Sequence, residues 1–137
     1  MVSKTKIELR YKDTDQMGVI HHSNYFVYFE LARIDFLKQL GYDYYQFESS
    51  GMMFPLRDVQ CTYLKSIKVT DVIYIYTSVV SFSKYQIEFS HEVKDESGEL
   101  KAKGRTKVVS VDTDTFELLK LDKHNPIFYE ELAKVAQ

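Results

Sequence analysis

Along much of this chain, hydrophobic residues alternate with polar ones, as they do in strands that bury one face. Residues 5–12 show the pattern first, with Ile7, Leu9 and Tyr11 set between charged neighbours. Pro55 interrupts a later stretch near its start, which favours a strand entry or an edge position there. Turn residues at 95–98 predict a hairpin. The further strand-like stretches cover residues 52–64, 71–82, 85–93 and 100–111.

A helical period begins at Ser23, where apolar residues recur every three or four positions up to Leu40. Ser23 or Asn24 is the expected N-cap, and Gly41 stands where a helix usually ends. Three further apolar residues widen the hydrophobic face, so we expect a helix that is buried on most sides. They are Phe26, Val27 and Leu31. A short terminal helix is predicted at about 126–135, with Pro126 in its first turn.

This order of elements predicts an α+β fold, with an antiparallel sheet of about five strands curved around one long helix. The 137 residues fit a single domain, 1–137, whose core covers about 5–120. So few strands leave sheet edges to be paired or shielded, and 20 Tyr and Phe residues suggest a large interface. We therefore expect at least a homodimer.

Composition excludes several functional classes. A formal net charge of −2 provides no field for capturing a nucleic-acid backbone, so no nucleic-acid partner is expected. No apolar run is long enough to span a membrane, and the first residues do not resemble a signal peptide. The single cysteine, Cys61, cannot form an internal disulfide, which favours a cytoplasmic location.

Candidate chemistry is concentrated in residues 11–25, which hold Asp13, Asp15, His21 and His22 just before the predicted helix. Free backbone N–H groups at a helix start can polarise a carbonyl oxygen. A carboxylate upstream can act as a nucleophile or as a general base toward water. The segment therefore permits acyl transfer.

Structural roles are the alternatives for these residues. Aspartates commonly begin loops, and a histidine before a helix often serves as a cap or lies on the surface. The spacing is not typical of a metal site, and we expect neither a metal nor a cofactor. Elsewhere, His91 is expected in the core and His124 on the surface, and Glu30 and Arg33 are spaced as a helical ion pair.

A longer motif resembles that of a known family. The residues that carry the resemblance are Asp13-Thr14-Asp15-x-x-Gly18-Val19-Ile20-x-His22-Ser23-Asn24-Tyr25-x-x-Tyr28-Phe29-Glu30-x-Ala32-Arg33. This pattern is similar to the signature of the hotdog-fold acyl-CoA thioesterases, in the hydroxybenzoyl-CoA thioesterase-like branch of the YbgC/FadM type. The resemblance covers about residues 5–120. Gln16-Met17 and His21 depart from the residues that are common at those positions.

The resemblance implies a curved sheet around a central helix and a homodimer joined edge to edge, or a homotetramer in which two such dimers pair. It also implies hydrolysis of an acyl-CoA in which coenzyme A is part of the substrate. Asp15 matches the catalytic carboxylate, and His22 matches the position whose N–H or imidazole addresses the thioester carbonyl. Two alternatives stay open, a thioesterase for acyl-carrier-protein thioesters and a noncatalytic module that binds acyl thioesters. The residues expected to bind substrate within the motif are Tyr11, Asp13, Gly18, Ser23, Tyr25 and Glu30.

The coenzyme A phosphates need cations or backbone N–H groups, and the chain has no Gly-rich phosphate loop. Lysines in short connections near strand ends are the remaining candidates. We expect Lys65, Lys68 and Lys84 to bind substrate in this way, with a purely solvated role as the alternative for each.

Overall fold

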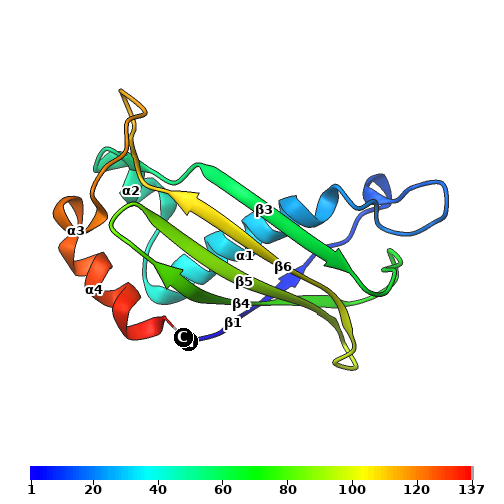
Figure 1. Cartoon of the computed structure of the whole chain (residues 1–137). Coiled ribbons are helices and arrows are strands. Elements are labelled where there is room, and N and C mark those ends of the chain that lie inside the picture. Colours follow the sequence, from blue (N-terminus) through cyan, green and yellow to red (C-terminus); the bar gives the residue numbers. More distant parts are fainter. Residues whose placement is uncertain (137) are drawn as a thin grey trace.

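The computed structural model describes residues 1–136 and confirms the predicted α+β hotdog fold (Figure 1). Five antiparallel strands form one sheet in the order β1-β4-β5-β6-β3, and the long helix α1 lies across one face of it. The strands of this sheet are β1 (Ser3–Ile7), β3 (Leu56–Tyr63), β4 (Ile73–Phe82), β5 (Gln86–Asp95) and β6 (Leu100–Val109).

Smaller elements surround this framework. A two-stranded ribbon of β2 (Met52–Met53) and β7 (Val111–Asp112) extends one end of the sheet. The helices are α1 (Asn24–Leu40), α2 (Tyr44–Ser49), α3 (Leu121–His124) and α4 (Pro126–Val135), and a 3₁₀ turn, η1, covers Tyr11–Asp13. Helices α3 and α4 lie at one end of the molecule, and the loop that precedes α1 lies at the other (Figure 1).

Helix α1 ends where the sequence predicts. Gly41 adopts φ +104, and its N–H donates to the carbonyls of Leu37 and Lys38. This left-handed conformation favours glycine because it has no Cβ.

The core lies between α1 and the sheet in two clusters. Phe29 and Ala32, in the first half of the helix, pack against Ile73 and Val93 of the sheet. The second half places Phe36 and Leu37 in a cluster that α4 and the α2–β2 segment also cover. The sheet positions the first cluster, and with it the helix start, at the end of the molecule that carries the predicted chemistry.

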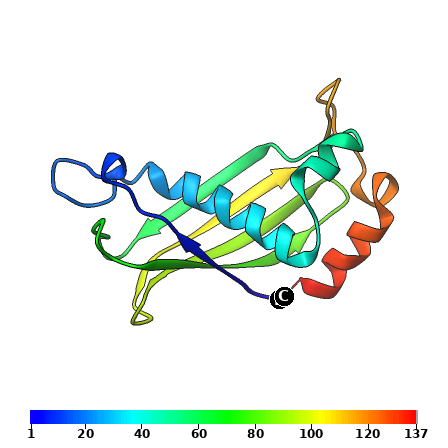
Figure 2. The same ribbon diagram turned by 180° about the vertical axis from the view of Figure 1, so that it is seen from behind.

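Two predicted features of the fold are wrong. The first strand ends at Ile7 rather than near residue 12, because Ile7 pairs with Ile73, where β4 begins, and the next residues have no strand to pair with. Helix α1 is not buried on most sides. Its outer face, including Val27 (52% exposed) and Leu31 (48% exposed), is open because the sheet covers one side only, and no other helix lies over that face (Figure 2).

Candidate active site

A tight loop positions Asp15 at the edge of a cavity. The Asp15 N–H donates to the Val19 carbonyl (2.8 Å), and the Gly18 N–H donates back to the Asp15 carbonyl (3.1 Å). Gly18 takes φ +78, a conformation that side chains with a Cβ rarely adopt. The Ile20 N–H donates to the Ile67 carbonyl (2.8 Å), so this loop is attached to the segment that leads into β4.

The Asp15 carboxylate is oriented by its own loop. Its Oδ1 accepts hydrogen bonds from the N–H groups of Met17 (2.8 Å) and Val19 (3.4 Å). Within residues 1–136, Oδ2 has no hydrogen-bond donor. One oxygen therefore fixes the carboxylate, and the other is available for chemistry.

The cavity has a volume of about 280 Å³ and lies between the Asp15 loop, the start of α1 and the end of β3. Its lining residues come from these three segments and are Asp15, Met17, Val19, Ile20, His22, Tyr25, Tyr63, Leu64, Lys65 and Ser66. Tyr25 is buried at the base of the helix, and burial raises its pKa to about 12. Its ring meets that of Tyr63 edge to face, with 4.8 Å between centroids.

The helix start offers one free backbone donor. The Ser23 N–H donates to His21 Nδ1 (3.2 Å), the Asn24 N–H to the His21 carbonyl (3.1 Å), and the Tyr25 N–H to the His22 carbonyl (3.3 Å). The His22 N–H has no acceptor in the described part of the chain. Of the N–H groups of residues 22–25, only that of His22 is therefore left to address a carbonyl oxygen.

The carbonyl of His22 is held from a distant strand. The Tyr63 hydroxyl donates to it across 2.9 Å, and 41 residues separate the two in sequence. This bond orients the peptide group that follows the free N–H donor. Sequence reasoning missed Tyr63, because only the fold brings the end of β3 to the helix start.

Asp13 lies behind the site and supports its backbone. Its carboxylate accepts from the Tyr28 hydroxyl (2.9 Å) and is paired with Lys12 (3.2 Å). Its carbonyl accepts from the His21 N–H and from Asn24 Nδ2, both at 2.8 Å. Burial raises the pKa of Asp13, but the hydrogen bonds from Tyr28 and Lys12 outweigh it and hold that pKa below its usual value.

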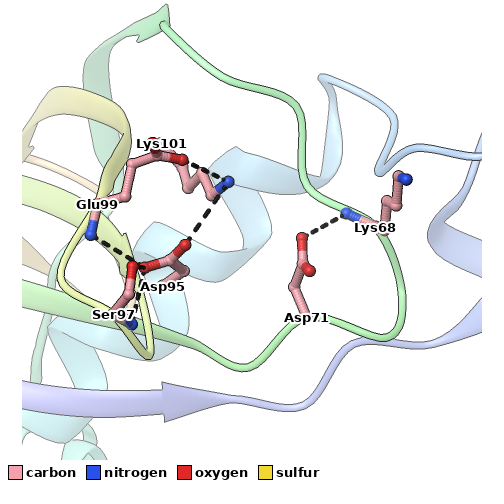
Figure 3. A network of polar contacts seen from close by, with 6 residues as sticks. All are labelled: Lys68, Asp71, Asp95, Ser97, Glu99 and Lys101. Atoms are coloured by element: carbon pink, nitrogen blue, oxygen red, sulfur yellow. Dashed lines mark hydrogen bonds and ion pairs between the residues drawn. The ribbon is translucent and has the colours of Figure 1, made fainter.

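A polar network supports the far wall of the cavity (Figure 3). Lys101 pairs with Glu99 (2.9 Å) and Asp95 (3.7 Å), and its carbonyl accepts from the N–H groups of Leu64 and Lys65. The hydrogen bond with Glu99 is the main cause that raises the pKa of Lys101. The network therefore holds the wall residues Leu64 and Lys65 against the β5–β6 hairpin.

The other predicted substrate-binding residues differ in position. Lys65 lines the cavity, and Lys68 lies in the adjoining segment, where its N–H donates to Asp71 (2.9 Å, Figure 3). Lys84 follows β4, whose ten residues span about 30 Å, so it lies at the opposite end of the sheet within one chain. Tyr11 is 81% exposed on η1 and Glu30 is exposed on α1, and neither lines the cavity. Asp13, Gly18 and Ser23 are also not among its lining residues, so Tyr25 is the residue of the predicted binding set within the motif that lines it.

Three further residues singled out in the sequence have defined positions in the structure. Ser23 is the N-cap position, but its side chain makes no cap hydrogen bond, and its hydroxyl contacts His21 Nδ1 (2.8 Å) instead. His91 is fully buried and His124 is exposed, as predicted. Among residues 1–136, no group of three His, Cys, Asp or Glu side chains is arranged to hold a metal. No helix in the same range is both long and apolar enough to cross a membrane.

Comparison with models of protein families identifies the family of this chain. A model of the thioesterase-like superfamily matches residues 9–132, nearly the whole chain. The chain belongs to this superfamily. The predicted resemblance is thereby confirmed.

Three proteins named as thioesterases match this chain over 89–96% of their own lengths, which confirms the assignment as a thioester hydrolase. A structure titled DHNA-CoA thioesterase, from Staphylococcus aureus, matches with a TM-score of 0.94 and 37% identity, over 97% of this chain and 89% of that one. YneP of Bacillus subtilis (strain 168), provisionally named as an acyl-CoA thioesterase, is 29% identical over 97% of this chain and 96% of its own length. The acyl-CoA thioesterase YbgC of Haemophilus influenzae is 26% identical over 95% and 90%.

Proposed function

We propose that this thioesterase-like protein hydrolyses acyl-CoA thioesters at the Asp15 cavity. The observation that carries the proposal is the pairing of a carboxylate oxygen that has no donor, Asp15 Oδ2, with an unpaired N–H at His22 on the wall of one cavity. A thioester carbonyl bound between them would meet a negative group and a hydrogen-bond donor. The names of relatives, which include acyl-CoA and DHNA-CoA thioesterases, support the substrate class.

Two mechanisms fit the same geometry. Acting as a nucleophile, Asp15 attacks the carbonyl carbon, the C–S bond breaks, and coenzyme A leaves as the thiol once it is protonated. The resulting mixed anhydride is then hydrolysed. Acting as a general base, Asp15 takes a proton from water, which attacks directly. In both, the His22 N–H stabilises the negative charge that develops on the carbonyl oxygen.

Labelled water distinguishes the two mechanisms. In H₂¹⁸O, a nucleophilic Asp15 acquires ¹⁸O whenever water attacks the anhydride at the Asp15 carbonyl, whereas attack at the acyl carbonyl labels the product acid alone, so label in the protein identifies the nucleophile. A general base leaves the protein unlabelled. Mass spectrometry of the peptide that contains Asp15 reads out the result.

We further propose a homodimer joined through β3. This strand is an edge of the sheet, paired on one side with β6 only, and most of its residues are exposed. Antiparallel pairing of two copies would satisfy its free backbone groups and form one continuous sheet. Light scattering should then give a mass of about twice 16.1 kDa or a multiple of it, and a stable monomer at micromolar concentration contradicts the proposal. A cytoplasmic location stays a prediction.

At the nucleotide end, Lys65 and Lys68 are the lysines that the fold places beside the cavity. Charge reversal at Lys65 should raise KM for an acyl-CoA more than for the matching pantetheine thioester, which lacks the phosphates. Lys84→Glu provides the comparison. Its position at the far end of the sheet predicts no effect unless a second subunit brings it close.

The deciding experiment measures hydrolysis by the wild type and by Asp15→Asn. The panel should include aliphatic acyl-CoAs, 1,4-dihydroxy-2-naphthoyl-CoA and an acyl-carrier-protein thioester. The asparagine keeps the size of the side chain but not its charge, so we expect kcat to fall about 100-fold or more. Asp114→Asn, at an exposed loop aspartate, is the matched control. Near-normal turnover by a folded Asp15→Asn protein contradicts the mechanism.

The same panel tests the two alternatives. Faster hydrolysis of the carrier-protein thioester than of every CoA ester indicates an acyl-carrier-protein thioesterase. Binding without hydrolysis of any thioester indicates a noncatalytic module.

A further inference from the structure

A second cavity, of about 320 Å³, opens beside the middle of α1 and shares no lining residue with the Asp15 cavity. Arg33 and Glu30 line it from the helix, and Tyr44 lines it from the start of α2. Phe54, just before the edge strand β3, and Leu56, its first residue, form part of the apolar wall. The cavity thus combines an apolar wall with a small polar group.

Arg33 is the unusual member of that group. It is only 5% exposed, and its Nε and Nη1 atoms are buried without a hydrogen-bond partner in residues 1–136. The ion pair with Glu30 that the sequence predicts is not formed, because Glu30 lies at the surface while Arg33 is covered. Burial lowers the pKa of Arg33, opposed by Tyr44 and Glu30.

Tyr44 is a hydrogen-bond partner of the guanidinium, but the buried Nε and Nη1 atoms have no partner among the described residues. Buried N–H donors without acceptors are costly, and proteins usually pair them with an anion or an oxygen acceptor. The cavity beside Arg33 restricts which acceptor fits. An added carboxylate would also meet the negative charge of Glu30, whereas a hydroxyl can accept from Arg33 and donate to Glu30. With Phe26, Phe54 and Leu56 in the wall, an aromatic ring that carries a hydroxyl suits both parts of the cavity.

The dimer proposed above places this cavity near the reacting centre. Tyr63 lies at one end of β3 beside the Asp15 cavity, and Leu56 lies at the other end beside the Arg33 cavity. Antiparallel pairing of two β3 strands brings the Tyr63 end of one subunit next to the Leu56 end of the other. The two cavities would then adjoin across the interface.

We propose that Arg33, with Glu30 and Tyr44, determines specificity by binding the ring hydroxyl of an aryl thioester whose carbonyl lies at Asp15 of the other subunit. This inference rests on the proposed function and adds the residues that would select a hydroxylated aryl group among acyl-CoA esters. It assigns a role in binding to two guanidinium nitrogens, Nε and Nη1, that residues 1–136 of one chain leave without a partner.

The test compares kcat/KM for two CoA esters that differ in ring hydroxyls, 1,4-dihydroxy-2-naphthoyl-CoA and 2-naphthoyl-CoA. We expect the wild type to prefer the hydroxylated ester by about 10- to 100-fold, the range for a hydrogen bond to a charged group. Arg33→Met keeps the length of the side chain and should remove most of this preference. Tyr44→Phe, which deletes one hydroxyl, should reduce it by less and provides a second test if Arg33→Met does not fold.

Matched controls remove the same groups outside the cavity. Lys38→Met deletes a cation further along the same helix, and Tyr45→Phe deletes the hydroxyl of the neighbouring, exposed tyrosine. Both should keep the wild-type preference.

Three results overturn the inference. The first is a wild type without preference for the hydroxylated ester. The second is an equal loss of kcat/KM on both esters in Arg33→Met and Tyr44→Phe, which indicates a structural role. The third is dissociation of the Arg33→Met dimer with its preference intact, which indicates that Arg33 pairs with a carboxylate of the second copy. If no CoA ester is hydrolysed by the wild type, the proposed function fails, and the inference fails with it.

Discussion

The buried His91 predicts a specific loss of stability in acid. Its ring lies between the Thr77 hydroxyl (2.9 Å from Nδ1) and the Thr106 hydroxyl (2.8 Å from Nε2), and it stacks on Phe29 with 4.6 Å between centroids. Burial is the main cause that lowers the pKa of His91 from 6.5 to about 3, and the nearby charge of Arg33 adds to it. The folded protein therefore holds this imidazole neutral.

The sign and size of the stability change follow from the linkage between proton binding and folding. Between pH 6.5 and 3 the unfolded chain binds a proton at His91 that the folded chain does not, so stability falls as pH falls through this window. One pKa unit corresponds to about 1.4 kcal/mol, so lowering the pH from 7.5 to 5 removes about 2 kcal/mol, and the full effect approaches about 5 kcal/mol near pH 3.

Other groups, including Asp13 with its lowered pKa, also favour unfolding in acid, so the test uses a difference. Urea unfolding of the wild type and of His91→Gln, at several pH values, gives the free energy that His91 contributes. That difference should shrink by about 2 kcal/mol between pH 7.5 and 5. In His124→Gln, which changes an exposed histidine, the difference should stay within a few tenths of a kcal/mol.

A constant difference for His91→Gln would refute the reasoning. If that variant does not fold, NMR of the wild-type imidazoles still tests it. The His91 resonances should not titrate above pH 4, and a midpoint near 6.5 contradicts the buried neutral state.

Two further predictions concern packing around the site. Tyr63→Phe removes the hydrogen bond to the His22 carbonyl, so kcat should fall about 3- to 10-fold with little change in Tm. The control Tyr45→Phe, at an exposed tyrosine, should leave kcat and Tm unchanged. Equal effects in the two variants contradict a positioning role for Tyr63. Gly104→Ala would place a Cβ 2.6 Å from Phe29 and 2.5 Å from a carbonyl oxygen of β3. Urea unfolding should therefore show a free energy of unfolding that is lower by about 1–3 kcal/mol. An unchanged urea midpoint refutes the clash.

Local rules account for the parts of the fold that the sequence predicted. The period of α1 and its Gly41 cap depend on residues next to one another, and the structure has the helix at Asn24–Leu40. The same holds for β5, whose alternation is regular because one face is buried and the other is not. The end of β1 could not be read in this way, since Leu9 and Tyr11 continue the alternation although no partner strand extends beside them.

The same distinction applies to the candidate site: residues within one loop could be located from the sequence, and contacts between distant segments could not. Asp15, Gly18 and His22 lie within one loop, so the motif locates them and the structure brings them to one place. Tyr63 could not be found, because its bond to His22 spans 41 residues and depends on the pairing of β3 with β6. The role of Asp13 was open for a related reason: its partner Tyr28 is one of many apolar-face residues until the helix is placed.

Within the loop, competition for hydrogen bonds decides which groups can do chemistry. Asp13 and Asp15 stand two residues apart, but Asp13 is occupied by Tyr28 and Lys12, while Asp15 is held by one oxygen only. The N–H groups after His22 are likewise used within the helix start. A charge or donor that is already satisfied contributes little to a transition state, whereas one held in place but unpaired is preorganised for it. The same criterion singles out Arg33, whose Nε and Nη1 have no partner in the described residues and lie beside a cavity that one subunit does not fill.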